Sequence, residues 1–238
     1  MHIGIDARFL SHQAFATRGM GRYTRGLLSA LLNLDDKNQY TIFAKEPTDL
    51  KNSLKGKKNK SSTFVEKLGI PKFSKKGILV NEIFYPLELY KHHFDATHFL
   101  FGEIAPIIKP SPSIVTVHDI TAFLFLDQST HSFRLNLRRK MLELNLKKSD
   151  MIVAISESTK SDLMKFFGLR ENKIQVISNG VEDIFRPTKR VDSKKFIFDK
   201  YKIKSDFFLY VGGFNETKNL LSLINIFVVA VLVSIKPW

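Results

Sequence analysis

The chain has 238 residues, a formal net charge of +14 and no cysteine. A hydrophobic fraction of 44% with 25% charged residues is typical of a soluble globular protein with one large or two small domains. The lack of cysteine excludes disulfides, thiolate catalysis and thiolate metal sites. Because Asp6 and Arg8 interrupt the start of the chain, no secretory signal peptide is predicted and a cytoplasmic location is expected.

The positive charge predicts an anionic partner. Nine lysines fall in one polar segment, residues 51–76. Few aromatic residues accompany them and no nucleic-acid-binding motif is found, so nucleic acid is not the expected partner. A solvated loop is the plainer interpretation. The functional alternative is attraction to an anionic membrane surface, where each lysine contributes about 1 kcal/mol.

A strand, a glycine-containing loop and a helix are predicted at the amino terminus. The strand is His2–Asp6, and the helix places four apolar side chains on one stripe, Tyr23, Leu27, Leu31 and Leu34. Gly19 and Gly21 lie in the loop between them, an arrangement that directs backbone N–H groups toward an anion. A tight turn is the alternative, since the full dinucleotide-binding fingerprint is absent.

The sequence Ile-Val-Thr-Val-His-Asp at residues 114–119 is the central candidate for a site. Its apolar, β-branched start is typical of a strand buried on both faces of a parallel sheet. His118 and Asp119 follow where that strand ends, and ligands of open α/β sheets bind beyond the carboxyl ends of the strands. His118 is therefore predicted to face a ligand, with a loop-capping role as the alternative.

Strands and helices alternate along the rest of the chain. Further strands are predicted at Tyr40–Ala44, Thr63–Val65, Ala96–Phe101, Met151–Ile155, Lys173–Ile177 and Phe208–Val211. Helices are predicted at Ile78–Tyr90 and Phe133–Leu146, and from an N-cap at Ser156 to a C-terminal Gly168. This alternation predicts an α/β fold with a doubly wound parallel sheet.

Six segments in this order resemble glycosyltransferase family 4, the retaining, nucleotide-sugar-dependent enzymes of GT-B fold. They are IGIDARF, GMGRYTRGLLSAL, VTVHDI, SDMIVAISESTKSDL, KIQVISNGVEDIFRP and FLYVGGFNETKNLLSLI. The similarity covers the amino-terminal half of such enzymes and extends to about Ile224. It implies a Rossmann-like acceptor-side domain at residues 1–186, with 187–238 as the crossover and the start of a donor-binding domain.

The resemblance also implies roles for individual residues. His118 corresponds to a histidine that contacts the donor sugar beside the reacting carbon. The other implied contacts are an acceptor and donor-phosphate loop of Gly19, Gly21 and Arg22, and a pyrophosphate site of Gly212, Gly213 and Lys218. Supporting roles are implied for Asp119, Ser156, Glu157, Asn179 and Gly180, of which Ser156 and Glu157 are more simply a helix cap. Many relatives have an arginine at Gly213 or Thr217, so Lys218 would be the single pyrophosphate cation.

The implied activity is transfer of a sugar, such as mannose, from a nucleotide diphosphate to a polysaccharide or lipid-linked acceptor. No metal and no cofactor are expected, and a peripheral position on the inner face of the membrane is left open. The family's pair of glutamates eight positions apart is missing, and the sequence after Ile224 departs from the family pattern. A truncated chain of weak or no activity is therefore expected, with a non-catalytic acceptor- or membrane-binding remnant as the alternative. The apolar residues 226–235 are too few to span a bilayer.

Overall fold

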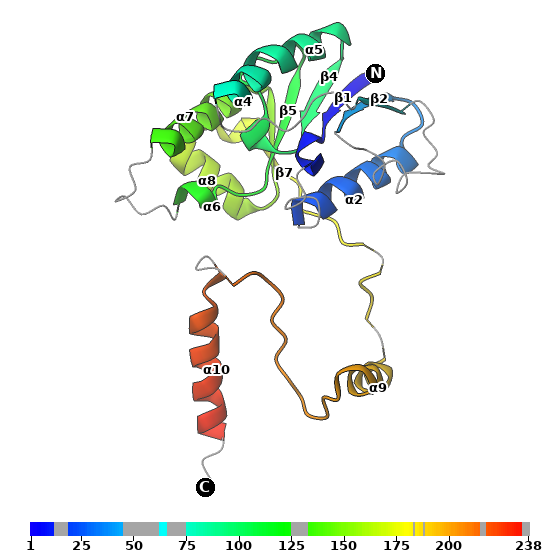
Figure 1. Cartoon of the computed structure of the whole chain (residues 1–238), viewed down its shortest axis with the longest axis vertical. Coiled ribbons are helices and arrows are strands. Elements are labelled where there is room, and N and C mark those ends of the chain that lie inside the picture. Colours follow the sequence, from blue (N-terminus) through cyan, green and yellow to red (C-terminus); the bar gives the residue numbers. More distant parts are fainter. Residues whose placement is uncertain are drawn as a thin grey trace. The chain divides into compact units, whose positions relative to one another are not determined.

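The structure is a computed structural model that describes residues 1–11, 19–44, 62–65, 75–124, 133–182, 184–187, 189–214 and 218–234 (Figure 1). The chain divides into two compact units, Met1–Glu182 and Asp183–Trp238, and each is described by itself. The functional division after residue 186 stays a prediction.

The first unit is built on a seven-stranded parallel sheet in the order β3-β2-β1-β4-β5-β6-β7. The strands are β1 (His2–Asp6), β2 (Gln39–Phe43), β3 (Ser62–Val65), β4 (Ala96–Phe99), β5 (Ser113–Val117), β6 (Met151–Ala154) and β7 (Ile174–Val176). This confirms the predicted doubly wound α/β fold. The strand order reverses between β1 and β4, which is where ligands bind in such sheets, at the carboxyl ends of the strands.

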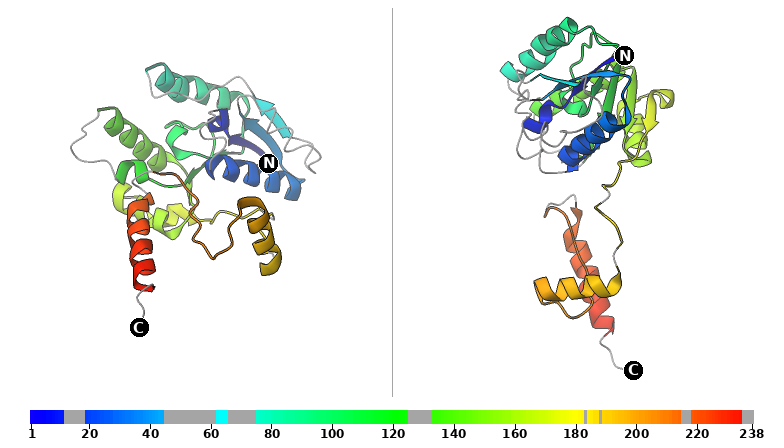
Figure 2. Two further views of the ribbon diagram at one scale, coloured as in Figure 1. Left: turned by 60° about the horizontal axis from the view of Figure 1, so that its bottom comes forward. Right: turned by 90° about the vertical axis from the view of Figure 1, so that its right-hand side faces the viewer.

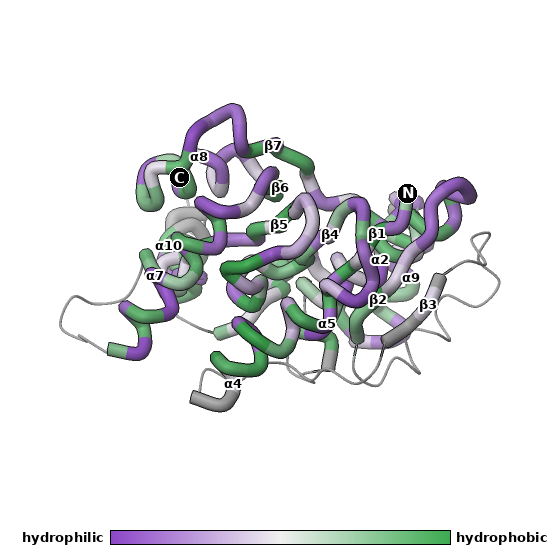
Figure 3. The backbone as a smooth tube through the Cα atoms, turned by 90° about the horizontal axis from the view of Figure 1, so that it is seen from above, coloured by the Kyte–Doolittle hydropathy of each residue, from purple (hydrophilic) through white to green (hydrophobic). Residues whose placement is uncertain are grey.

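Helices cover both faces of this sheet. Helix α2 (Gly19–Leu34) packs on one face, where Leu28 and Leu32 join Ile5 and Ile42 in one core. Helices α5 (Tyr85–Lys91), α7 (Phe133–Lys148) and α8 (Glu157–Phe167) share a second core with β5 and β6. Figure 2 shows α2 and α5 on opposite sides of the sheet. Because both faces are covered, β5 is largely hydrophobic along its length (Figure 3).

The predicted helix at 78–90 is present, with one irregularity. It consists of α4 (Lys75–Leu79), a π-helical turn η2 (Val80–Phe84) and α5. Pro86 lies at the start of α5, directly after the π turn, and cannot donate a backbone hydrogen bond to that turn. The π turn therefore separates two regular segments at the point where the proline would otherwise interrupt one long helix.

Two expectations about the first helix were wrong. Helix α2 already begins at Gly19, so Gly19 and Gly21 belong to its first turn and not to a loop. Its buried side is shifted by one residue from the predicted stripe and consists of Gly21, Thr24, Leu28 and Leu32. Leu34, predicted to be buried, is 82% exposed. Tyr23, Leu27 and Leu31 of the predicted stripe lie at the border of the buried side and pack partly against the same core, so the sequence pattern places the stripe next to the side that is fully buried.

Helix α8 has the predicted ends. Ser156 Oγ accepts a hydrogen bond from the Thr159 backbone N–H, and Gly168 adopts a left-handed conformation with φ 61°. Shorter segments complete the unit: the 3-10 turns η1 (Arg8–Ser11), η3 (Gly102–Ile104) and η4 (Glu171–Lys173), and helix α6 (Thr121–Leu124).

The second unit contains helices α9 (Arg190–Tyr201) and α10 (Leu220–Ser234). The predicted strand Phe208–Val211 is wrong, since these residues are irregular and carry no strand pairing. None of the residues described in this unit is buried. A parallel strand needs neighbours to accept and donate its hydrogen bonds, and the described part of this unit provides none. In the described part of the chain, no helix combines the length and apolar character needed to cross a bilayer.

Candidate functional site

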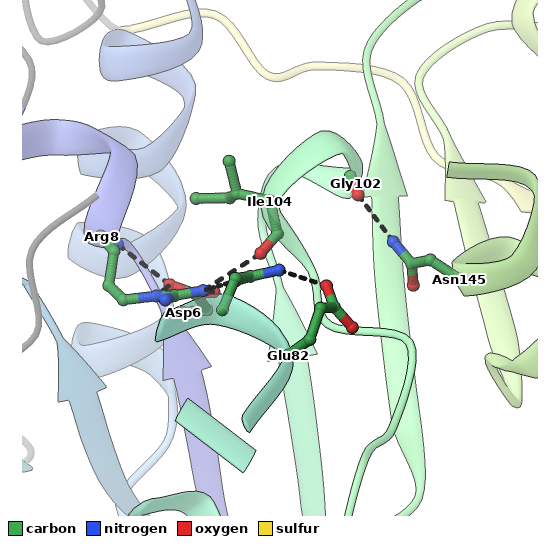
Figure 4. Close-up of polar contacts among 7 residues, drawn as sticks. Asp6, Arg8, Glu82, Gly102, Ile104 and Asn145 are labelled. Atoms are coloured by element: carbon green, nitrogen blue, oxygen red, sulfur yellow. Dashed lines mark hydrogen bonds and ion pairs between the residues drawn. The ribbon is translucent and has the colours of Figure 1, made fainter. Parts of the chain in front are cut away.

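A buried ion pair lies beside the turn that follows β4 (Figure 4). Arg8 follows β1 and binds Asp6 through two hydrogen bonds, Nε to Oδ1 at 2.9 Å and Nη2 to Oδ2 at 2.8 Å. Arg8 Nη2 also donates to the Ile104 carbonyl at 3.1 Å and to Asn81 Oδ1 at 3.2 Å. The guanidinium lies 3.3 Å from the Tyr85 ring centroid. The two charges neutralise each other within the protein, and the bonds of Arg8 Nη2 connect the end of β1 to η2 and η3.

The turn η3 after β4 is braced from two further sides (Figure 4). Asn145 Nδ2 of α7 donates to the Gly102 carbonyl at 2.7 Å, and Glu82 Oε2 accepts from the Ile107 N–H at 2.8 Å. A cavity of about 20 Å³ lies among these polar groups, which is room for a single water molecule. The carboxyl end of β4 is therefore a rigid platform for the residues opposite it.

His118 stands at this platform, directly after β5, and its side chain is half-buried. Its Nε2 atom lies 3.1 Å from the Leu100 carbonyl oxygen. A carbonyl can only accept, so Nε2 carries the hydrogen and a neutral ring keeps Nδ1 as an acceptor. Burial lowers the pKa of His118, although the Leu100 carbonyl and Asp119 oppose this shift. His118 is therefore a neutral acceptor at physiological pH.

Three elements orient His118. The Tyr23 ring of α2 packs edge-to-face on the His118 ring with centroids 4.8 Å apart, and Phe101 lies 6.5 Å away. Thr159 Oγ1 of α8 donates to the His118 carbonyl at 3.2 Å. The same Thr159 is held by the helix cap at Ser156. The ring and backbone of His118 are thus held by residues from α2, from the segment that follows β4 and from α8.

A short polar chain lies behind His118 on the α2 side of the sheet. The Tyr23 hydroxyl is 3.5 Å from Thr116 Oγ1, and His98 Nε2 is 2.8 Å from the same oxygen. Burial raises the pKa of Tyr23 and lowers the pKa of His98 to about 4. Sequence reasoning missed His98 and Thr116 as site neighbours. The pattern that could have found them is their inward position on adjacent strands ending at the same edge.

The first turn of α2 lies at the same end of the sheet as His118. Tyr23, which contacts His118, is one helical turn beyond Gly19. Gly19 and Arg22 are exposed, while Gly21 is buried. A Cβ atom at Gly19 would meet no heavy atom within 4 Å. The structure therefore brings the predicted glycines and His118 to one edge of the sheet, with the start of a helix in place of a loop.

Two of the predicted supporting residues, Asp119 and Ser156, have structural contacts. Asp119 Oδ1 accepts the Thr121 N–H at 2.9 Å and so begins α6. Ser156 caps α8, and Glu157 beside it is exposed. Asn179 and Gly180 are exposed near the end of the first unit. Their predicted ligand contacts stay predictions.

The predicted pyrophosphate residues belong to the second unit. Gly212, Gly213 and Lys218 are all exposed. The Tyr210 hydroxyl donates to the Gly213 carbonyl at 2.8 Å, and a Cβ at Gly212 would lie 2.6 Å from that hydroxyl. A side chain at position 212 would therefore displace the Tyr210 hydroxyl. The grouping of these residues with His118 stays a prediction. Among the residues that the structure describes, no cluster of three histidines or carboxylates could hold a metal ion.

The fold defines the class as a Rossmann-like α/β domain, with His118 at the carboxyl edge of its parallel sheet. The model of Glycosyltransferase Family 4 matches residues 17–183, and the chain belongs to this family. The predicted Rossmann-like domain of a GT-B glycosyltransferase is thereby confirmed. No curated protein matches the chain.

Solved structures with the same fold include HepE of Anabaena. The HepE complex with UDP and glucose has a TM-score of 0.52 and 17% identity, covering 84% of this chain and 50% of HepE. The HepE complex with UDP-glucose has a TM-score of 0.52 and 14% identity, covering 84% and 49%. A glycosyltransferase from Rickettsia africae has a TM-score of 0.44 and 17% identity, covering 86% and 50%. The chain thus spans about half the length of the solved structures that it matches.

Proposed function

We propose that this chain forms the acceptor-side half of a retaining, nucleotide-sugar-dependent glycosyltransferase. The observation that carries the proposal is His118, held at the carboxyl end of β5 as a neutral ring whose Nδ1 accepts. Membership of Glycosyltransferase Family 4 supports it, as does the fold shared with HepE, which has been solved with UDP-glucose. In the reaction, His118 Nδ1 accepts a hydrogen bond from a hydroxyl of the donor sugar.

The chemistry assigned to this half is positioning. Fixed hydrogen-bond partners stabilise charge that develops at the reacting carbon without forming a covalent bond to it. The N–H groups of the first turn of α2 face the partial negative charge of an acceptor or phosphate oxygen. Gly212, Gly213 and Lys218 then contact the pyrophosphate. We propose a hexose such as mannose as the sugar and a polysaccharide or lipid-linked glycan as the acceptor.

Ligand-observed NMR on the full chain with UDP-glucose and GDP-mannose tests this function. Because placement of the donor needs contacts from both halves, we expect a dissociation constant of about 1 mM or weaker. His118→Ala should remove the signal of the sugar protons, and Lys218→Ala should weaken that of the whole ligand. His93→Ala, an exposed histidine before β4, and Lys195→Ala on α9 are matched controls. Equal signals in all variants would mean that the ligand binds elsewhere.

A non-catalytic acceptor- or membrane-binding role is the second candidate. The exposed character of the second unit favours it, since none of its described residues is buried. Complete lack of nucleotide-sugar signal would support this candidate over the first. The lysine-rich segment 51–76, which falls mostly outside the described residues, would then draw the chain to anionic lipid at the inner face of the membrane. Such binding should weaken steeply with salt.

A further inference from the structure

Helix α10 has a composition unlike that of the helices in the first unit. Its sequence LLSLINIFVVAVLVS contains no charged residue, and its polar residues are Ser222, Asn225 and Ser234. Helix α2, by comparison, presents charged Arg22 on its exposed side and packs Leu28 into the core. A helix that is apolar all round is stable either inside a protein core or in lipid.

The exposed apolar side chains of α10 surround the helix. Leu223, Val228 and Val229 are 49%, 47% and 60% exposed. With about 100° between successive residues, these three lie on different sides of the helix, roughly 120° apart. Another protein, including a second copy of this chain, would cover one side of α10. A lipid phase covers all sides at once.

The remainder of the second unit carries positive charge. Residues 183–238 contain ten basic and five acidic residues. Five of the lysines lie in α9 and just after it and are exposed: Lys194, Lys195, Lys200, Lys202 and Lys204. Lys218 lies two residues before the start of α10. Lysines beside an apolar helix complement the head groups of anionic lipids.

The length of α10 limits how it can meet a bilayer. Its 15 residues extend about 22 Å, less than the hydrocarbon thickness of about 30 Å. We propose that α10 inserts into one leaflet of an anionic lipid bilayer and anchors the second unit there, with the lysines around α9 at the head groups. This anchoring is independent of sugar transfer and of the lysines at 51–76.

The full chain with vesicles of phosphatidylcholine, alone or mixed with phosphatidylserine, tests the proposal. The only tryptophan is Trp238, close after α10, so its fluorescence reports insertion. We expect a blue shift, and quenching by lipids brominated on their acyl chains. The signal should be strongest with phosphatidylserine and should persist at about 1 M salt, where charges are screened over about 3 Å.

Two substitutions make the test specific. Val228→Asp places a charge in the middle of α10 and should weaken vesicle binding at least tenfold. Val191→Asp makes the same change in α9, where Val191 is 79% exposed, and should leave binding within about twofold. Urea unfolding of the first unit should be the same in both variants.

Three results would overturn the proposal. The first is that the chain binds no vesicles at all. The second is vesicle binding that high salt abolishes and that is equally strong in both variants. The third is a dimer that sediments without lipid and is dissociated by Val228→Asp, together with no vesicle binding. The second result assigns the membrane contact to lysines alone, and the third assigns α10 to a second copy of the chain.

Discussion

Apolar segments of the two units differ in burial and in secondary structure. In the first unit, Val115 and Val117 of β5 are 0% and 3% exposed, because β4 and β6 pair with the strand and helices cover both faces. In the second, Phe208 and Val211 are 86% and 84% exposed in an irregular segment. Apolar character thus makes a strand only where neighbours satisfy its backbone and cover its side chains.

Ion pairs show the same contrast. The Asp6–Arg8 pair is almost fully buried and carries additional hydrogen bonds to Asn81 and Ile104. The Lys194–Asp206 pair of the second unit is 3.4 Å long, with side chains 60% and 84% exposed. Water screens the charges of the Lys194–Asp206 pair, so each is stable without the other. In the buried Asp6–Arg8 pair, a charge that loses its partner is left uncompensated.

The largest expected effect is therefore at Arg8. Arg8→Ala leaves Asp6 as a buried, uncompensated charge and should destabilise the first unit by about 3–5 kcal/mol in urea unfolding. Lys194→Ala is the matched control and should cause no measurable change. Similar losses in the two variants would mean that burial does not distinguish the pairs.

A smaller effect is expected from pH at His98. Its pKa is about 4 in the folded chain against an ordinary value of 6.5, so the unfolded chain takes up a proton first as pH falls. The stability contributed by neutral His98 is complete above pH 6.5 and decreases below it, by about 1–2 kcal/mol at pH 5. The lowered pKa of His118 acts in the same direction.

Urea titrations between pH 7 and 5 measure this decrease. His98→Asn, which can still bond to Thr116, should flatten the dependence on pH. His93→Ala should not change it. A slope unaffected by His98→Asn would show that another group titrates in this range.

The two helix starts at Ser156 and Lys189 provide the third comparison. Ser156→Ala removes the cap of α8 and should cost about 1 kcal/mol in the unfolding of the first unit. Lys189 caps α9 without any side-chain hydrogen bond, so Lys189→Ala should leave the circular dichroism and the unfolding unchanged. A neutral Ser156→Ala would show that Thr159 and its contact with His118 hold α8 without the cap.

The smallest expected effect is at Tyr23. Its hydroxyl lies at the outer limit of a hydrogen bond to Thr116, so Tyr23→Phe should change stability by less than about 0.5 kcal/mol. The ring contact with His118 remains, and nitrogen NMR should find Nε2 of His118 protonated and Nδ1 unprotonated in both proteins. A switch of tautomer in Tyr23→Phe would show that the hydroxyl, not the Leu100 carbonyl, orients the ring.

Local patterns in the sequence predicted most of the first unit. The short apolar runs at β1, β5 and β6 predicted parallel strands, and Ser156 and Gly168 predicted both ends of α8. His118 was recognised because it directly follows a strand. Each of these features depends on residues that are close together along the chain, so the sequence alone is enough to predict it.

The tertiary structure alone decided which side of α2 is buried, the burial of the Asp6–Arg8 pair and the Tyr23–His118 contact. Tyr23 and His118 come from different elements, and their meeting depends on strand order and not on spacing along the chain. Residues 208–211 show the opposite outcome: their sequence pattern is typical of a strand, but they form no strand. Backbone hydrogen bonds of a sheet and the burial of its side chains come from distant segments, so only those segments determine the outcome.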